Sequence, residues 1–158
     1  MTRRPRLPAL DPAEIAPRTG SDYPQPFDEP CAARARRMLG DPLGLTQFGV
    51  NVMTLPPGAW SSQRHWHLEE DEFVYVLEGE VVLATDAGEQ VLRAGMAAGF
   101  PAGKRDGHHL INRSGHPARV LEVGTRTARE HAEYSDIDMQ GETEDGVFRY
   151  RHKDGRRY

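Results

Sequence analysis

Two histidines and a glutamate near the middle of the chain, His65, His67 and Glu72, have the residue types and the spacing of metal ligands. In a β-strand, residues two apart lie on the same face, about 7 Å from each other along the strand. His65 and His67 can therefore direct their imidazoles at one point, while Trp66 faces the other way. Residues 68–71 allow a tight reversal, and Glu72 begins the run EFVYVLEG, which is β-branched and aromatic enough to be a strand. The pattern predicts two imidazoles and a carboxylate in one small volume.

A second stretch, residues 95–112 (GMAAGFPAGKRDGHHLIN), carries two adjacent histidines. Together the two stretches resemble the paired motifs of the cupin superfamily, and the resemblance covers roughly residues 45–125. In the family the first motif is a Gly, HxH, three or four residues, a Glu, six residues and a Gly; the second is a Gly, Pro-x-Gly, a His, three residues and an Asn. The residues that match are Gly58, His65, His67, Glu72 and Gly79 for the first motif, and Gly95, Pro101, Gly103, His108 and Asn112 for the second. The loop before His65 is one residue longer than is usual in the family, and the loop before His108 is two residues longer.

The resemblance implies one divalent transition-metal ion per chain, held by His65, His67, Glu72 and His108. Imidazole and carboxylate ligands suit Fe, Mn, Ni, Cu or Zn, and the sequence does not choose among them. His109 faces the opposite side of its strand from His108, which indicates a packing or supporting role.

Other ionisable residues near these motifs have simpler readings. Glu69, Glu70 and Asp71 are interpreted as loop charges; the alternative is that one of them is the ligand, and Glu72 is preferred for its spacing to Gly79. His116, His131 and His152 lie in turns or in the polar tail and are expected to be solvated.

Short strands at regular spacing, without alternating helices, predict an all-β fold. We expect a single cupin double-stranded β-helix (a jelly-roll barrel) with an extended N-terminal arm and a C-terminal hairpin. The expected division is an arm over residues 1–40, the barrel over 41–127, and an extension over 128–158. Residues 80–85 and 89–93 read as one hairpin, and residues 147–158 as another that turns at Asp154–Gly155.

The N-terminal arm is rich in proline, which excludes a regular helix there. For residues 32–39 a strand is preferred to a helical turn. Arg34, Arg36 and Arg37 are interpreted as a solvated face in preference to an anion clamp. Because small cupins commonly pair through N-terminal strands, the resemblance also predicts a homodimer.

Length and composition limit the remaining possibilities. A chain of 158 residues fits one domain. The net charge of −4, with mixed signs, argues against non-specific nucleic-acid binding, and no apolar segment has the length of a membrane span. The apolar stretch after Arg3, Arg4 and Arg6 is too short for a secretory signal. The single cysteine, Cys31, fits a reducing compartment, so a cytoplasmic location is predicted.

Three neutral imidazoles and one carboxylate around a divalent ion leave a net charge of about +1, which favours an anionic oxygen ligand. The functional hypothesis is therefore a metal-dependent enzyme that acts on a small, oxygen-rich, anionic molecule. The resemblance allows a sugar-phosphate isomerase or epimerase, or a dioxygenase. The alternative is a non-catalytic cupin that binds or senses a small ligand. The sequence assigns no catalytic base, substrate or native ion.

Overall fold

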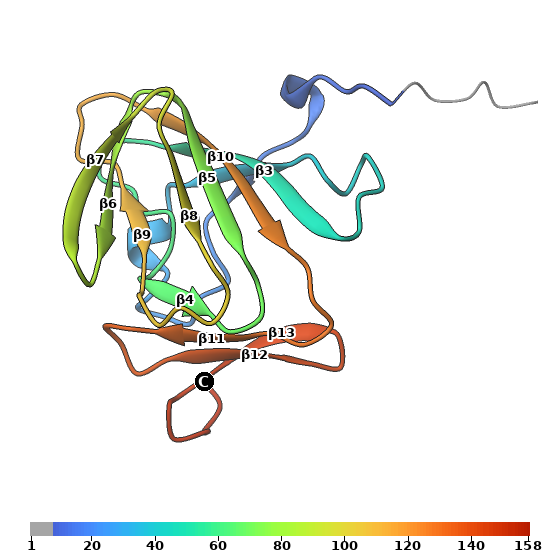
Figure 1. The fold of residues 1–158 in the computed structure, drawn as a ribbon, viewed down its shortest axis with the longest axis vertical. Helices are drawn as coiled ribbons and strands as arrows, with labels where there is room; N and C mark the ends of the chain where they lie inside the picture. Colours follow the sequence, from blue (N-terminus) through green and yellow to red (C-terminus); the bar gives the residue numbers. More distant parts are fainter. Residues whose placement is uncertain (1–7) are drawn as a thin grey trace, which may run out of the picture.

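The computed structural model describes residues 8–158, so the first seven residues of the predicted arm, including Arg3, Arg4 and Arg6, lie outside the described residues. The described chain consists mainly of short strands (Figure 1). No helix within it is long and apolar enough to cross a membrane. The elements are η1 (Pro12–Glu14), β1 (Arg18–Thr19), η2 (Glu29–Cys31), β2 (Ala35–Met38), β3 (Phe48–Leu55), β4 (His65–His67), β5 (Glu72–Glu78), β6 (Glu80–Thr85), β7 (Gly88–Arg93), β8 (Ala97–Phe100), β9 (His109–Ile111), β10 (Ala118–Thr125), β11 (His131–Tyr134), β12 (Gln140–Glu144) and β13 (Val147–Arg151).

These strands form three antiparallel sheets. The largest has the order β1-β2-β3-β10-β5-β8, a second has the order β7-β6-β9, and the third, β13-β12-β11-β4, lies across one end (Figure 1). The prediction of an all-β jelly roll is confirmed. The prediction of a closed barrel is wrong, because in the described residues β4 meets the chain next to β9 only through the single bridge His65–His108. β4 and β9 have three residues each, too few to extend a continuous ladder between the sheets.

The core lies between the large sheet and the β6–β7–β9 sheet. Alternate residues of β3, β5 and β10 face inward, and they pack against β6 and β7 in one buried apolar cluster. Toward the β4 end the inward positions become polar, with Asn51, Glu72 and Glu122 on the same face as Met53, Val74 and Val120. The apolar core therefore continues directly into a polar cavity.

Gly79 ends the first motif and lies between β5 and β6. Its φ of +75° is in the left-handed region, and a Cβ at this position would lie 2.9 Å from the Pro117 carbonyl oxygen. Any other residue would be strained in its backbone and would clash with the chain that leads into β10.

The C-terminal segment differs from the prediction. β12 and β13 form a five-pair hairpin around Asp145–Gly146, where both residues have positive φ, as a two-residue hairpin turn requires. The predicted turn at Asp154–Gly155 exists, but it closes only one bridge, Arg151–Arg157. The predicted terminal hairpin was therefore assigned to the wrong Asp-Gly pair. The strand preferred for residues 32–39 is present as β2, paired with β3.

Hydrogen bonds join the three predicted parts of the chain. β2, before residue 40, pairs with β3, and β11, after residue 127, pairs with β4. The division at residues 40 and 127 remains a prediction. Cys31 is fully buried against residues of the N- and C-terminal segments, in the same cluster as Tyr134 and Met139.

Candidate metal centre

The short strand β4 presents His65 and His67 on the same face. His65 is also bridged to His108: the His65 amide donates to the His108 carbonyl (3.2 Å) and the His108 amide to the His65 carbonyl (2.9 Å). Residues directly opposite each other in an antiparallel pair project their side chains to the same side. This bridge therefore brings His108 beside the two histidines of β4, although more than 40 residues of chain separate them.

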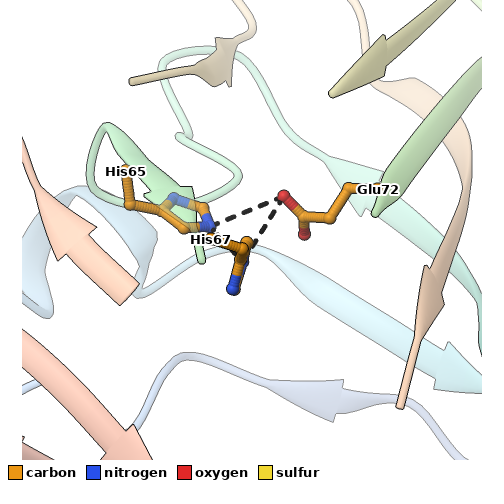
Figure 2. A group of neighbouring side chains, drawn as sticks. All are labelled: His65, His67 and Glu72. Atoms are coloured by element: carbon orange, nitrogen blue, oxygen red, sulfur yellow. Dashed lines mark hydrogen bonds and ion pairs between the residues drawn. The ribbon is translucent and has the colours of Figure 1, made fainter. Parts of the chain in front are cut away.

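Glu72, the first residue of β5, points its carboxylate toward His65 and His67 (Figure 2). His65 Nε2 lies 3.0 Å from His67 Nε2. Glu72 Oε2 lies 3.7 Å from His65 Nε2, 3.5 Å from His67 Nε2 and 2.6 Å from His108 Nε2. Ligands held about 2.1 Å from one ion are themselves roughly 3.0–3.4 Å apart. His65, His67 and Glu72 therefore converge on a volume close to that of a metal site, and His108 joins them through its hydrogen bond to Glu72.

The hydrogen bonds behind the histidines orient the ring nitrogens. His65 Nδ1 donates to the Gln63 carbonyl (2.8 Å), so Nε2 carries the lone pair that faces Glu72. His67 Nδ1 lies 3.4 Å from the buried Glu130 carboxylate, whose Oε1 accepts from the Leu68 and His131 amides. A carboxylate behind a histidine is a common support for a metal ligand, because it fixes the ring and the tautomer. The donor set thus fits a divalent ion in residue type, spacing and ring orientation.

The charges of the group also favour a cation at its centre. Burial lowers the pKa of His65 to about 3 and keeps this ring neutral. Burial acts in the same direction on His67, but the Glu130 and Glu72 carboxylates, 3.4 and 3.5 Å from its two ring nitrogens, outweigh it and raise its pKa to about 10. Burial opposes ionisation of Glu72, yet His108 and His67 hold its pKa well below the usual range. The raised pKa of His67 shows that the surrounding carboxylates favour positive charge at this point, as they would favour a divalent ion.

The other ionisable residues considered from the sequence have separate roles. His109 Nδ1 donates to the Ser62 carbonyl (3.0 Å) and its ring packs edge-on against Trp60, a packing arrangement. Glu70 accepts from the Thr127 amide and hydroxyl, and its carboxylate lies within 4.8 Å of ligand atoms of His67 and Glu130. Asp71 accepts from the Ala102 amide, and His116 is exposed. His131 and His152 are paired with surface carboxylates.

A cavity of about 760 Å³ opens over the four residues. Aromatic rings pack against its histidines: Phe100 stacks on His108 with ring centroids 3.6 Å apart, and Tyr134 of β11 stacks on His65 at 5.5 Å. Tyr134 lies directly opposite His65 in the β4–β11 ladder. No sequence motif contains Tyr134 or Glu130, because both belong to a polar segment whose pairing with β4 is a tertiary feature.

Two arginines that were interpreted as a solvated face lie in the cavity wall, which corrects that interpretation. Arg34 is only 7% exposed, and Arg36 forms a two-fold hydrogen-bonded ion pair with Glu122 of β10. Arg36 is paired with the inward-facing Met53, and Arg34, two residues earlier, projects to the same side. In the sequence, the spacing of two residues between Arg34 and Arg36 was the signal for a shared face, and Arg37, opposite Val52, lies on the other face of β2.

Comparison with known proteins agrees with this fold. A cupin-domain family model matches residues 51–124. A crystal structure of a Silicibacter pomeroyi protein described as a sugar phosphate isomerase from a cupin superfamily is 47% identical, with a TM-score of 0.92, and the match covers 96% of each chain. The chain belongs to the cupin superfamily.

More distant structures show the same fold. A putative sugar phosphate isomerase from Acidithiobacillus ferrooxidans is 24% identical with a TM-score of 0.79, over 96% of each chain. A predicted oxalate decarboxylase from Thermotoga maritima is 21% identical with a TM-score of 0.61, over 75% of this chain and 99% of the other. No curated protein matches the chain.

Proposed function

We propose that this protein is a metal-dependent cupin isomerase that acts on a small sugar phosphate, with the ion held by His65, His67, Glu72 and His108. The observation that carries the proposal is the 47% identity, across 96% of both chains, to a protein described as a sugar phosphate isomerase. The convergence of His65, His67 and Glu72, with His108 bonded to the same carboxylate, supports the metal part of the proposal independently of that likeness.

His65, His67, Glu72 and His108 would hold a divalent ion, which would act as a Lewis acid toward the carbonyl and hydroxyl oxygens of an aldose or ketose. Other residues of the chain position the histidine rings and shield them from solvent. Glu130 and the Gln63 carbonyl hold the rings of His67 and His65, and Phe100 and Tyr134 shield two of the histidines from bulk water. The cavity volume of about 760 Å³ lies within the range of roughly 300–1,000 Å³ that is typical of small-molecule sites.

Isomerisation is tested directly with the purified protein, loaded in turn with Fe, Mn, Ni, Cu and Zn ions. Each form is incubated with a panel of aldose and ketose phosphates in D₂O and followed by NMR. We expect interconversion of one aldose–ketose pair, with deuterium entering the carbon next to the carbonyl and no oxygen uptake. Oxygen consumption with an enol or hydroxy-ketone would instead identify the dioxygenase reaction. Tight ligand binding without turnover under any of these ions would identify the non-catalytic alternative.

The metal assignment is tested by variants. His65→Ala and Glu72→Gln each remove one ligand from the proposed site, so metal content by elemental analysis should fall below one-tenth of an ion per chain while the circular dichroism spectrum is retained. His116→Ala is the matched control, because it removes an exposed histidine from a turn and should leave metal content unchanged. Full metal occupancy in both site variants would refute the assignment.

A further inference from the structure

Arg34 stands apart from the other arginines of the cavity wall. Arg18 is paired with Asp22, Arg36 with Glu122, and Arg126 with Asp41. Arg34 is the most deeply buried of the four, yet among residues 8–158 no carboxylate lies within ion-pair distance of it. Its pKa is lowered by burial, which is the electrostatic cost of holding a cation out of water without a counter-charge.

The hydrogen bonds of Arg34 leave part of its guanidinium free. Nε donates to the Gly20 carbonyl (3.0 Å), and Nη1 donates to the Ser61 carbonyl. Nη2 donates to no atom of the described residues, and it is not among the polar atoms that the protein encloses completely. An arginine has five N–H donors in a fixed plane, so at least one edge of this group remains available to an acceptor in the cavity.

The surroundings hold the guanidinium in place. Its carbon lies 5.8 Å from the centre of the Tyr23 ring, a cation–π arrangement. Tyr23 packs edge-on against Tyr134 with centroids 5.6 Å apart, and Tyr134 stacks on His65. The two backbone bonds and this aromatic chain fix Arg34 relative to the four proposed metal ligands, which line the same cavity. Glu122 is already engaged by both hydrogen bonds from Arg36.

We propose that Arg34 is the anchor for the phosphate group of the substrate, and that it holds this end of the molecule while the sugar oxygens meet the His65–His67–Glu72–His108 centre. This inference deepens the proposed function and rests on it for the identity of the substrate. A phosphate monoester carries nearly two negative charges and three acceptor oxygens, so it supplies both the counter-charge and the acceptors that Arg34 lacks. Arg34 thereby becomes a specificity residue that selects phosphorylated sugars over neutral ones.

The test uses inorganic phosphate as the probe and isothermal titration calorimetry as the readout, with metal-loaded and metal-free protein compared. Arg34→Gln and Arg34→Met remove the charge, and both should weaken phosphate binding about 10- to 100-fold, the range expected for charged hydrogen bonds. Metal content should not change. Arg126→Met is the matched control, because Arg126 lines the same cavity but is paired with Asp41, and it should change the affinity less than about twofold. Wild-type affinity in the Arg34 variants would overturn the proposal.

A crystal of the wild-type protein with tungstate gives an independent answer if neither Arg34 variant folds. The oxyanion should lie within hydrogen-bond distance of the Arg34 guanidinium. An oxyanion found only on the metal, or no oxyanion in the cavity, would overturn the proposal.

Activity measurements separate this proposal from the proposed function. If sugar phosphates are isomerised and Arg34→Gln leaves KM unchanged, the anchor is wrong while the isomerase stands. If phosphate binding depends on Arg34 but no sugar phosphate is converted, the anchor stands and the isomerase is wrong. Where both hold, Arg34→Gln should raise KM for sugar phosphates with a smaller change in kcat.

Discussion

Metal uptake by this protein should release close to one proton per ion at pH 8, because the ion has to displace the proton on His67. Without an ion, burial lowers the pKa of His67, but the close carboxylates of Glu130 and Glu72 outweigh this effect and raise it to about 10. His65 contributes no proton, since burial lowers its pKa to about 3. The expected proton therefore belongs to one named residue.

The size of the effect follows from the pKa of His67. A pH of 7 is about three units below the pKa of the His67 ring. Removing the proton at this pH costs roughly 4 kcal/mol and reduces the apparent metal affinity about a thousandfold. The loss of affinity becomes tenfold smaller for each unit by which the pH rises. The logarithm of the affinity should therefore rise with a slope near +1 between pH 7 and pH 9 and level off near pH 10. A histidine with the ordinary pKa of about 6.5 would give almost no slope in this interval.

The proton is counted by titrating Mn²⁺ into metal-free protein in two buffers of different ionisation enthalpy. Mn²⁺ is preferred to Zn²⁺ because water bound to Zn²⁺ titrates at about pH 7–9 and would add a proton of its own. Release of fewer than about 0.3 protons per ion at pH 8, or an affinity that is flat from pH 7 to pH 9, would refute this account of His67. In Glu130→Gln the main support for the raised pKa is lost, so the slope should flatten.

Three further predictions concern other parts of the molecule. Glu130→Gln should also weaken metal affinity about 10- to 100-fold near pH 9, where proton competition is small, because the ring of His67 loses its carboxylate support; competition with a chelator measures this, and unchanged affinity would show that Glu130 does not position the ring. Gly79→Ala should destabilise the fold by about 1–3 kcal/mol in urea unfolding, since the backbone has φ +75° and the new Cβ would meet the Pro117 carbonyl; a variant as stable as the wild type would contradict the structure at this turn. Light scattering should give twice the chain mass of 17.7 kDa, as the predicted homodimer requires, and a monomer at micromolar concentration would exclude it.

Arg34 and Arg36 show that the direction in which a strand face points became clear only once the pairing of β2 with β3 was known. Arg34 and Arg36 have the same spacing as His65 and His67, and a period of two places each pair on one face. The motif context identified the face for the histidines. For the arginines no local pattern distinguished a cavity wall from solvent, because the outcome depended on β2 pairing with β3 so that Arg36 lies opposite Met53.

The sequence by itself identified the family and the all-β class and predicted four side chains for the candidate metal centre, because those features depend on short-range spacing: period-two strands, glycines at turns, and histidines two residues apart. The tertiary structure decided which residues surround the centre. Glu130 and Tyr134 reach His67 and His65 only because β11 adds to the edge of β4, and Arg34 reaches the cavity only because β2 adds to the edge of β3. It also decided that the sheets do not join into a closed barrel and that the C-terminal hairpin turns at Asp145–Gly146. Such choices depend on which strand edges meet, and edge pairing is set by the packing of the whole chain rather than by any local run of residues.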